Sequence, residues 1–452
     1  MRIVYYLAAG AAAAVITFVL SVVIARVGMR FRLYPKIRER DVHKRPTPRL
    51  GGIAMFIGIV AVFGIASQVP QFHLIFADPG PVLAILGSAL FIVLIGVADD
   101  IWDLDWITKL AGQLLAAGLL AWQGVQLTSL PMVGGILILS PYAGLVITVL
   151  AIVLVMNATN FIDGLDGLVA GVTIIANGVF FIYSYLLSTN IAQTEYFNLA
   201  SFITAVLIGA CVGFLPLNWH PARLFMGDSG SMLVGLLMAT SAISVTGQLD
   251  ATSLTGSRQL FPAFIPIILP FVIFIVPLLD FALAVFRRLR AGKSPFSADR
   301  KHLHHRLLDM GHSDVHAVLI FYSWTVVVAV GCLLFLFVPT VWALLFVVVG
   351  LVACTVYTLA PLSRRKTVEA AVQSAEVGTA ELADAAHLDP LDEAANSTEP
   401  GDERLGPSEQ RAVEALIAAT GEIPRQTAPE PRASEQTASQ QQPSSDQKGE
   451  TP

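Results

Sequence analysis

The sequence contains few charged residues and almost no cysteine. Only 13% of its 452 residues are charged and 55% are hydrophobic, with a mean hydropathy of +0.69, whereas an ordinary soluble domain has roughly 25% charged residues. This composition excludes a soluble globular enzyme. The three cysteines, Cys211, Cys332 and Cys354, lie in apolar stretches without the spacing of a disulfide framework or a metal site, so we interpret them as core residues.

The charges that are present divide the chain into two parts. Residues 1–366 contain 23 Lys and Arg against 16 Asp and Glu, whereas residues 367–452 contain 5 against 17. The second part is rich in Ala, Glu, Pro, Ser and Gln and is too polar to bury a core. We predict a transmembrane domain over residues 1–362 and an acidic, largely disordered tail over residues 363–452, with one short helix over 408–421.

Long stretches of the first part contain no Asp, Glu, Lys or Arg. A helix crosses a bilayer with about 20 apolar residues, and backbone polar groups in lipid must hydrogen-bond within their own segment. We therefore predict an all-α polytopic membrane protein with about eleven transmembrane helices, the first of them a retained span rather than a signal peptide. The expected spans are residues 3–25, 50–70, 80–98, 109–124, 136–157, 167–187, 198–217, 229–247, 261–286, 316–337 and 341–361.

Lys and Arg gather on one side of these expected spans. The loops on that side hold 21 of the 23 Lys and Arg of residues 1–366, and Arg2 and Arg258 lie on the other side. Because cytoplasmic loops carry an excess of positive charge, we predict a multi-pass membrane protein. Its N-terminus is expected outside, and its C-terminus and polar loops in the cytoplasm.

Acidic residues recur at the predicted cytoplasmic ends of the helices, where a carboxylate is energetically costly and therefore a functional candidate. Asp99, Asp100, Asp103 and Asp105 lie within seven residues and repel one another unless a cation compensates their charge. The spacing of Asp99 and Asp103 predicts that they share a helical face. A solvated acidic loop is the alternative interpretation.

Two further polar clusters precede predicted helices on the same side. The members of the first cluster stand at every third position: Asn157, Asn160, Asp163 and Asp166. The second comprises Asn218, His220, Arg223, Phe225 and Asp228. Helix starts offer backbone N–H groups that can bind a phosphate, but a polar turn and a helix cap, respectively, are the alternative interpretations.

Basic residues form two more clusters on this side. One contains Lys44 and Arg49, and the other contains His302, His304, His305 and Arg306. Because the histidines lack cysteine or acid partners at ligand spacing, an anion site is favoured over a zinc site; basic loops that only set the topology are the alternative. Asp280, inside a predicted span, either faces the same site or pairs with Arg287.

Together, the acidic and basic clusters describe one kind of site. Carboxylates can hold a divalent cation through oxygen ligands, and basic side chains can bind phosphate, so the sequence predicts a site for a magnesium-bound diphosphate at a lipid surface. An ion-coupled transporter is a competing interpretation. Transporters, however, place their binding groups near the bilayer midplane within internal repeats, whereas the acids here, Asp280 apart, lie at one face.

Five segments in this order resemble the polyprenyl-phosphate N-acetylhexosamine-1-phosphate transferases, over about residues 1–360. They are "DVHKRPTPRLGG", "GVADDIWDLD", "NATNFIDGLDG", "LNWHPARLFMGDSGS" and "DRKHLHHRL". The resemblance implies transfer of N-acetylglucosamine 1-phosphate from UDP-N-acetylglucosamine to undecaprenyl or decaprenyl phosphate, which releases UMP and starts a cell-envelope polysaccharide. Within the same family, the phospho-N-acetylmuramoyl-pentapeptide transferase of peptidoglycan synthesis is the alternative, but "HLHHRL" resembles the polysaccharide branch.

The resemblance also implies roles for individual residues. It implies that Asp99, Asp100 and Asp163 are catalytic and that Asp228, together with Asp99 and Asp163, binds Mg²⁺, for which Mn²⁺ can substitute. The implied ligands of the UDP-sugar and the polyprenyl phosphate are Lys44, Arg49, Asn160, Asp166, Asn218, Phe225, His302, His304, His305 and Arg306. Tyr34 stands where relatives often have Asp, which weakens any role of that position. The resemblance also implies a homodimer in the lipid of the bacterial plasma membrane, without a nucleic-acid partner.

Overall fold

The computed structural model describes most of the predicted transmembrane part of the chain. The described residues are 2–34, 46–132, 135–190, 195–246 and 312–359, together with Phe286, Leu289, Arg290, Gly292 and Leu307. The chain divides into two units, Met1–Ala375 and Glu376–Pro452. Every described residue lies in the first unit, and the predicted tail lies outside the described residues.

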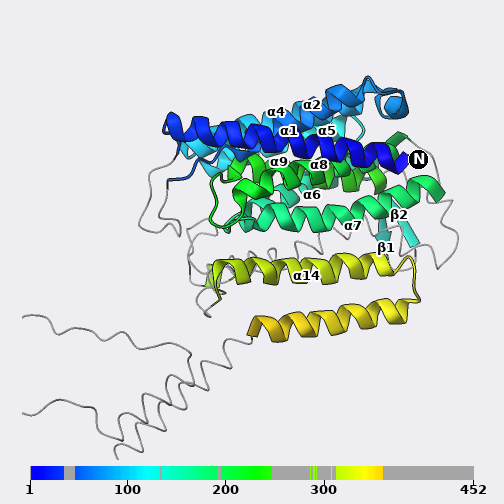
Figure 1. The fold of residues 1–452 in the computed structure, drawn as a ribbon. Helices are drawn as coiled ribbons and strands as arrows, with labels where there is room; N and C mark the ends of the chain where they lie inside the picture. Colours follow the sequence, from blue (N-terminus) through cyan, green and yellow to red (C-terminus); the bar gives the residue numbers. More distant parts are fainter. Residues whose placement is uncertain are drawn as a thin grey trace, which may run out of the picture. The chain divides into compact units, whose positions relative to one another are not determined.

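The described residues are almost entirely helical (Figure 1). The long helices are α1 (Arg2–Arg30), α2 (Gly51–Ala66), α4 (Pro79–Trp102), α5 (Trp106–Trp122), α6 (Pro141–Ile162), α7 (Leu168–Asn190), α8 (Glu195–Asn218), α9 (Gly227–Thr246), α14 (Asp314–Leu334) and a last helix, Thr340–Leu359. This confirms the predicted class, an all-α polytopic membrane protein.

The described residues contain fewer candidate transmembrane spans than the eleven predicted. Within the described residues, eight helices are long and apolar enough to cross a membrane, or nine if one bent pair is counted as a span. Helix α5, with 17 residues, is shorter than these eight. The expected span 261–286 lies outside the described residues except for Phe286, so the count of eleven stays a prediction.

The starts of several helices follow directly from local sequence. Asp78 precedes Pro79 and accepts a hydrogen bond from the Gly80 N–H at 3.0 Å. Ser140 precedes Pro141 and begins α6 in the same way. Asp and Ser side chains satisfy backbone donors that the first helical turn leaves unpaired, and Pro fits the first helical position because its missing N–H is not needed there.

Helix α9 lies at the centre of the described bundle. It packs against α2, α4, α6 and α8, and nearly all of its residues are buried. Helix α1 packs on α8, α14 packs on α7, and Thr340–Leu359 exposes most of its surface (Figure 1). A helix that is apolar all round is expected either inside a core or in lipid, and α9 occupies the inside position.

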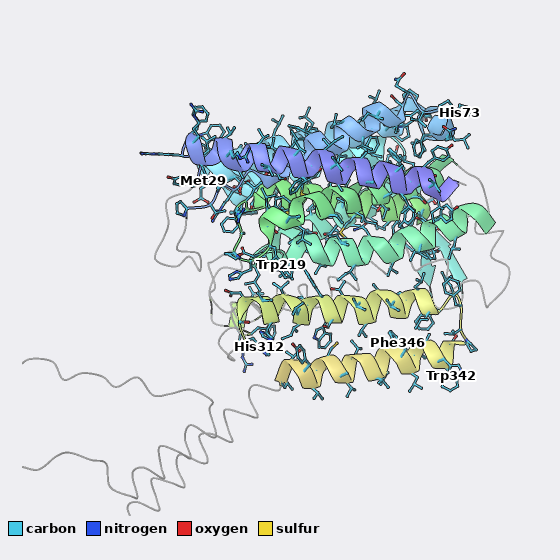
Figure 2. The ribbon with its side chains drawn as sticks, viewed as in Figure 1. Met29, His73, Trp219, His312, Trp342 and Phe346 are labelled. Atoms are coloured by element: carbon cyan, nitrogen blue, oxygen red, sulfur yellow. The ribbon has the colours of Figure 1, made fainter. Side chains whose placement is uncertain are left out.

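The two ends of the helices carry different residues. Figure 2 places Met29, Trp219 and His312 at one end, and His73 and Trp342 at the other. The loops that contain the acidic clusters, between α4 and α5, α6 and α7, and α8 and α9, all lie at the end of Trp219. The structure therefore brings to one end the segments that the sequence predicted on one side of the membrane.

Two local features differ from the sequence-based expectation. Residues 136–138, expected in a span, belong to an antiparallel hairpin of β1 (Ser129–Met132) and β2 (Gly135–Ile138). A short apolar run fits a strand as well as a helix, and α6 begins only at Pro141. After α2, the 3₁₀ helix η1 (Pro70–Phe72) and α3 (His73–Phe76) turn the chain by 99°, so 50–70 is not one straight span.

Candidate active site

The four acids at the end of α4 and before α5 have different local partners. Asp103 ends α4 in a left-handed conformation with φ +57°, and Asp105 caps α5 by accepting hydrogen bonds from the Ile107 and Thr108 N–H groups. These bonds lower the pKa of Asp105, the Thr108 contacts first. The prediction that Asp99 and Asp103 share a helical face is wrong, because the helix stops between them at Trp102.

Asp100 connects the end of α4 to the start of α9. Its carboxylate accepts hydrogen bonds from the N–H groups of Asp228, at 3.1 Å, and Ser229, at 3.3 Å, and from the Ser229 hydroxyl, at 3.2 Å. The start of a helix carries unpaired N–H groups and a partial positive charge, which a carboxylate stabilises. Asp100 thereby satisfies part of the start of the central helix from a neighbouring helix.

Gly227 makes this close approach sterically possible. Its φ is +70°, a conformation that L side chains rarely adopt. A Cβ atom at this position would stand 2.5 Å from the Asp100 carboxylate and 2.5 Å from the Arg49 carbonyl oxygen. The glycine before Asp228 is therefore required for the contact between α4 and α9.

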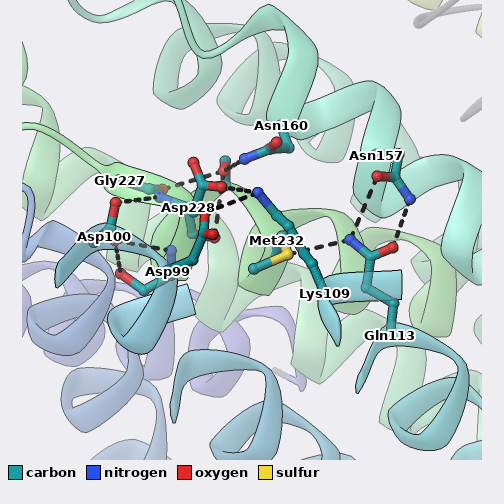
Figure 3. Close-up of polar contacts among 11 residues, drawn as sticks. Asp99, Asp100, Lys109, Gln113, Asn157, Asn160, Gly227, Asp228 and Met232 are labelled. Atoms are coloured by element: carbon teal, nitrogen blue, oxygen red, sulfur yellow. Dashed lines mark hydrogen bonds and ion pairs between the residues drawn. The ribbon is translucent and has the colours of Figure 1, made fainter. Parts of the chain in front are cut away.

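Lys109 links two acids from different helices (Figure 3). Its ammonium group lies 3.0 Å from the Asp99 carboxylate and also pairs with the Asp228 carboxylate. The three side chains are 13% to 29% exposed, so the pairs are screened less by water than pairs on a surface. Carboxylates from α4 and α9 thus converge on one point next to the first turn of α5.

Asp163 adds a further negative charge at this point. It caps the end of α6, and burial together with the negative charges of Asp228 and Asp100 raises its pKa to about 8, against an opposing effect of Arg49. The predicted candidates Asp99, Asp100, Asp163, Asp228 and Arg49 therefore lie near one another. We call Asp99, Asp100, Asp163 and Asp228 the acidic cluster.

Amide side chains of α5 and α6 lie next to the acidic cluster (Figure 3). The Asn160 amide donates to the Ser231 hydroxyl at 2.9 Å, which joins α6 to α9. One turn after Lys109, the fully buried Gln113 accepts a hydrogen bond from the Asn157 amide at 2.6 Å, and its own amide donates to Asn157 at 3.4 Å (Figure 3). These contacts fix the rotation of α5 and α6 relative to each other.

Asp166 and Asn218 hold the loop between α8 and α9. Asp166 lies within hydrogen-bonding distance of His220 Nδ1, at 3.0 Å, and accepts a bond from the Ala222 N–H at 3.0 Å. The Asn218 amide accepts from the Gly167 N–H at 3.0 Å and donates to the Leu224 carbonyl at 3.1 Å. Both side chains are almost fully buried, so in this structure they fix the loop that leads to Asp228.

The structure also describes two of the remaining candidates, Phe225 and the basic residue Arg49. Phe225 is half-buried, and its backbone joins the loop to the start of α2, since its N–H donates to Pro48 and its carbonyl accepts from Gly51. Arg49 is exposed. The remaining candidates lie outside the described residues: Lys44, His302, His304, His305 and Arg306. Asp280 and Arg287 also lie outside them.

The fit of the site to Mg²⁺ can be judged from its donors. In the described part of the chain, no three His, Cys, Asp or Glu side chains are placed to hold a metal ion by themselves. The carboxylates of Asp99 and Asp228, however, meet at one cation. Mg²⁺ is usually bound through one or two carboxylates plus substrate phosphates and water, so the donors present fit a metal that arrives with a diphosphate.

Sequence reasoning missed Lys109 and Gln113 as site residues. Lys109 was counted only as one of many positive charges near the membrane. The signal that could have identified it is its isolation, because no other charged residue occurs in the apolar stretch of α5 that follows Asp105. Gln113 follows at i+4 on the same helix, a spacing that places both residues on one face.

Comparison with known proteins gives consistent matches. A sequence model described as glycosyl transferase family 4 matches residues 82–246. The decaprenyl-phosphate N-acetylglucosaminephosphotransferase of Mycolicibacterium smegmatis is 39% identical over 359 residues, which cover 79% of this chain and 88% of that protein. The protein of the same name from Mycobacterium leprae is 41% identical over 325 residues, 71% of this chain and 81% of its own length.

A more distant relative has a related name. The probable undecaprenyl-phosphate N-acetylglucosaminyl 1-phosphate transferase of Bacillus subtilis is 30% identical over 336 residues, 73% of this chain and 84% of that protein. All three similarities extend well beyond the segment that the family model matches. The relatives therefore resemble this chain over most of its predicted transmembrane part.

Proposed function

Because the chain belongs to glycosyl transferase family 4, among the transferases that act on polyprenyl phosphates, we propose that it transfers N-acetylglucosamine 1-phosphate to a polyprenyl phosphate. The proposed donor is UDP-N-acetylglucosamine, and the products are UMP and polyprenyl-diphosphate-N-acetylglucosamine. The observation that supports this best is the convergence of Asp99 and Asp228 on Lys109 at the end of the helix bundle. The lipid product would start a cell-envelope polysaccharide.

The chemistry is a displacement at phosphorus. An oxygen of the lipid phosphate bonds to the phosphorus that carries the sugar, and the bond from this phosphorus to the oxygen of UMP breaks. Both reactants are anions, so positioning and charge neutralisation dominate catalysis. Lys109 forms ion pairs with two members of the acidic cluster, Asp99 and Asp228. It can neutralise a substrate phosphate once these acids have another partner.

That partner is proposed to be Mg²⁺, or Mn²⁺ in its place, held by Asp99 and Asp228 together with the substrate phosphates. Asp163, the third ligand that the resemblance implies, does not form a three-ligand group with them in this structure. When bound, the ion would supply positive charge to the diphosphate and to the leaving UMP. Asp100 keeps the peptide of Asp228 in place, and Asn160 holds Ser231 one turn further along α9. The described side chains thus orient the ligands from three helices.

A dedicated base for the nucleophile is not needed at neutral pH. The second pKa of a phosphate monoester is about 6, so the lipid phosphate is largely dianionic there. Asp99 and Asp100 already have partners, namely Lys109 for the first and the start of α9 for the second. We therefore assign both residues to placement of the metal and the phosphates rather than to proton removal.

The proposed membrane orientation puts this site in the cytoplasm, where the soluble donor is. Exposed aromatic side chains flank the helices at both ends: Trp102 and Trp106 near the acidic cluster, and Trp122, Tyr142 and Trp342 at the opposite ends. Trp and Tyr favour membrane interfaces, so these five residues delimit the apolar layer. Because cytoplasmic loops carry an excess of Lys and Arg, we propose that the N-terminus lies outside and the C-terminus in the cytoplasm. The homodimer that the resemblance implies stays part of this proposal.

One assay tests the proposal. Purified protein in detergent is incubated with polyprenyl phosphate and a panel of UDP-sugars, with and without Mg²⁺, and UMP release is measured. We expect release with UDP-N-acetylglucosamine that requires both the lipid and the metal. Release only with UDP-N-acetylmuramoyl-pentapeptide would replace the proposed donor, and no release with any donor would contradict a transferase and favour an ion-coupled transporter.

A further inference from the structure

Tyr322 of α14 touches the turn that carries two of the candidate residues. Its hydroxyl donates a hydrogen bond to the Gly167 carbonyl at 2.6 Å. Gly167 lies between α6 and α7, directly after Asp166 and four residues after Asp163. Figure 1 shows α14 alongside α7, and Tyr322 reaches from α14 to the start of that helix.

The ring of Tyr322 fits against the backbone of α7 at a glycine. A Cβ atom on Gly171 would lie 1.9 Å from the Tyr322 hydroxyl oxygen and 2.0 Å from Cζ. Such a contact is impossible, so only glycine allows the ring to approach this closely. The position of the hydroxyl is therefore set by the shape of α7 as well as by its hydrogen bond.

The Gly167 backbone is held from two sides. Its N–H donates to Asn218 of α8 at 3.0 Å, and its carbonyl accepts from Tyr322 as well as from the Gly171 N–H of its own helix. Gly167 has a φ of +77°, which other residues rarely adopt. Helices α8 and α14, which are distant in the sequence, thus hold the two peptide groups on either side of this glycine.

We propose that Tyr322 is a positioning residue of the transferase, whose hydroxyl fixes the 163–167 turn so that Asp163 stays within the acidic cluster. This inference rests on the proposed function. Helix α14 lies outside the segment 82–246 that the family model matches. A residue near the end of the described chain thereby controls the geometry of a site built from α4, α6 and α9.

Loss of this hydroxyl should affect turnover more than binding of the lipid. Asp163 is proposed to act on the donor diphosphate, and a displaced group at the reacting centre slows the chemical step strongly. We expect Tyr322→Phe to lower kcat on the order of tenfold, with the KM for polyprenyl phosphate unchanged. The ring itself remains between α7 and α14 in this variant, so the protein should fold.

The matched control is Ser323→Ala on the same helix. Within the part of the chain that the structure describes, the half-buried Ser323 donates its hydroxyl hydrogen to the Leu319 carbonyl of the same helix, at 2.8 Å. Its removal therefore deletes a hydroxyl from α14 without touching the turn. Ser323→Ala should have the kcat and KM values of the wild-type protein.

The experiment measures kcat, both KM values, melting temperature and amide hydrogen exchange of residues 163–167 in the full chain. Slower turnover and faster exchange at this turn in Tyr322→Phe alone support the proposal. A lower melting temperature with unchanged kcat and exchange would show a purely structural role and overturn it. If the unchanged protein releases no UMP, the proposed function fails; the exchange data then still decide whether Tyr322 fixes the turn.

Discussion

The carboxylate of Asp100, in the last turn of α4, accepts a hydrogen bond from the backbone N–H of Asp228, the second residue of α9, at 3.1 Å. One acid thus holds the peptide that carries another. Because the donors at a helix start cannot find other partners when buried, Asp100 contributes to stability as well as to the site. Asp100 therefore caps the start of α9, whereas Asp228 is the proposed metal ligand.

Asp100→Ala should therefore destabilise the protein, by about 2 kcal/mol, since it leaves the Asp228 and Ser229 donors unpaired. Asp100→Asn keeps an acceptor oxygen and should lose less stability. Unfolding in a detergent titration measures both. Equal stability of Asp100→Ala and the unchanged protein would contradict a capping role, and recovery of Asp100→Asn activity near pH 9 would favour a catalytic base instead.

Asp228→Asn should lose most of the activity and raise the Mg²⁺ concentration needed for half-maximal rate. The substitution keeps the size of the side chain but removes a negatively charged oxygen ligand, which Mg²⁺ prefers. The measurement is UMP release across a Mg²⁺ titration. Asp314→Asn is the matched control, because Asp314 also lies in the first turn of a helix, α14, but far from Asp228 in the sequence. If Asp228→Asn kept normal turnover and Mg²⁺ dependence, Asp228 would not be a metal ligand.

Lys109→Met should reduce turnover on the order of 100-fold, because it removes the cation that the reacting phosphates can use. Without Mg²⁺ it should also lower the melting temperature, since the carboxylates of Asp99 and Asp228 would repel each other. Added Mg²⁺ should restore the melting temperature but not the turnover. The conservative control is Lys109→Arg, and a fully active Lys109→Met would exclude the assigned role.

The pH dependence of stability should reveal Asp163. Burial and the nearby carboxylates raise its pKa from 3.8 to about 8 in the folded protein, so the folded state binds the proton more tightly than the unfolded state does. Stability of the metal-free protein should therefore fall as pH rises from about 4 to about 8. Asp163→Asn should flatten this decline in melting curves recorded with a chelator.

Asp105 provides the contrasting case for the same measurement. Its hydrogen bonds with Thr108 lower its pKa, so its stabilising contribution is present above pH 3.8 and is lost as the pH falls through the lower folded value. Asp105→Asn should lower the melting temperature by a nearly constant amount above about pH 4 and should change its pH dependence only in the more acidic range. A changed slope between pH 4 and 8 in Asp105→Asn, or an unchanged slope there in Asp163→Asn, would contradict the assignment of the two groups.

Local patterns predicted the parts of the fold that depend on local chemistry. Apolar stretches located the long helices, and Asp78 with Pro79 and Ser140 with Pro141 mark helix starts that are readable from sequence. The hairpin of β1 and β2 escaped detection because an apolar run as short as 136–138 has no distinctive period. The family resemblance is confirmed by the relatives.

The partners of the polar residues could not be predicted, because they depend on contacts between distant segments. Asp99 and Asp228 are far apart in the sequence and meet only when α5 brings Lys109 between α4 and α9. Asp166 was expected to bind substrate, yet its contacts with His220 and Ala222 hold a loop. No local pattern distinguishes a side chain that will face a ligand from one that will face a neighbouring loop.

Helix α5 has a consequence for the bilayer itself. Its 17 residues span about 26 Å at 1.5 Å per residue, less than the roughly 30 Å of a typical hydrocarbon layer. Leu115, Leu119 and Ile107 of this helix are exposed, so hydrophobic mismatch should draw the headgroups inward beside it. The resulting dimple would lower the phosphate of a membrane-dissolved isoprenoid toward Lys109 without any need to lift its chain out of the lipid.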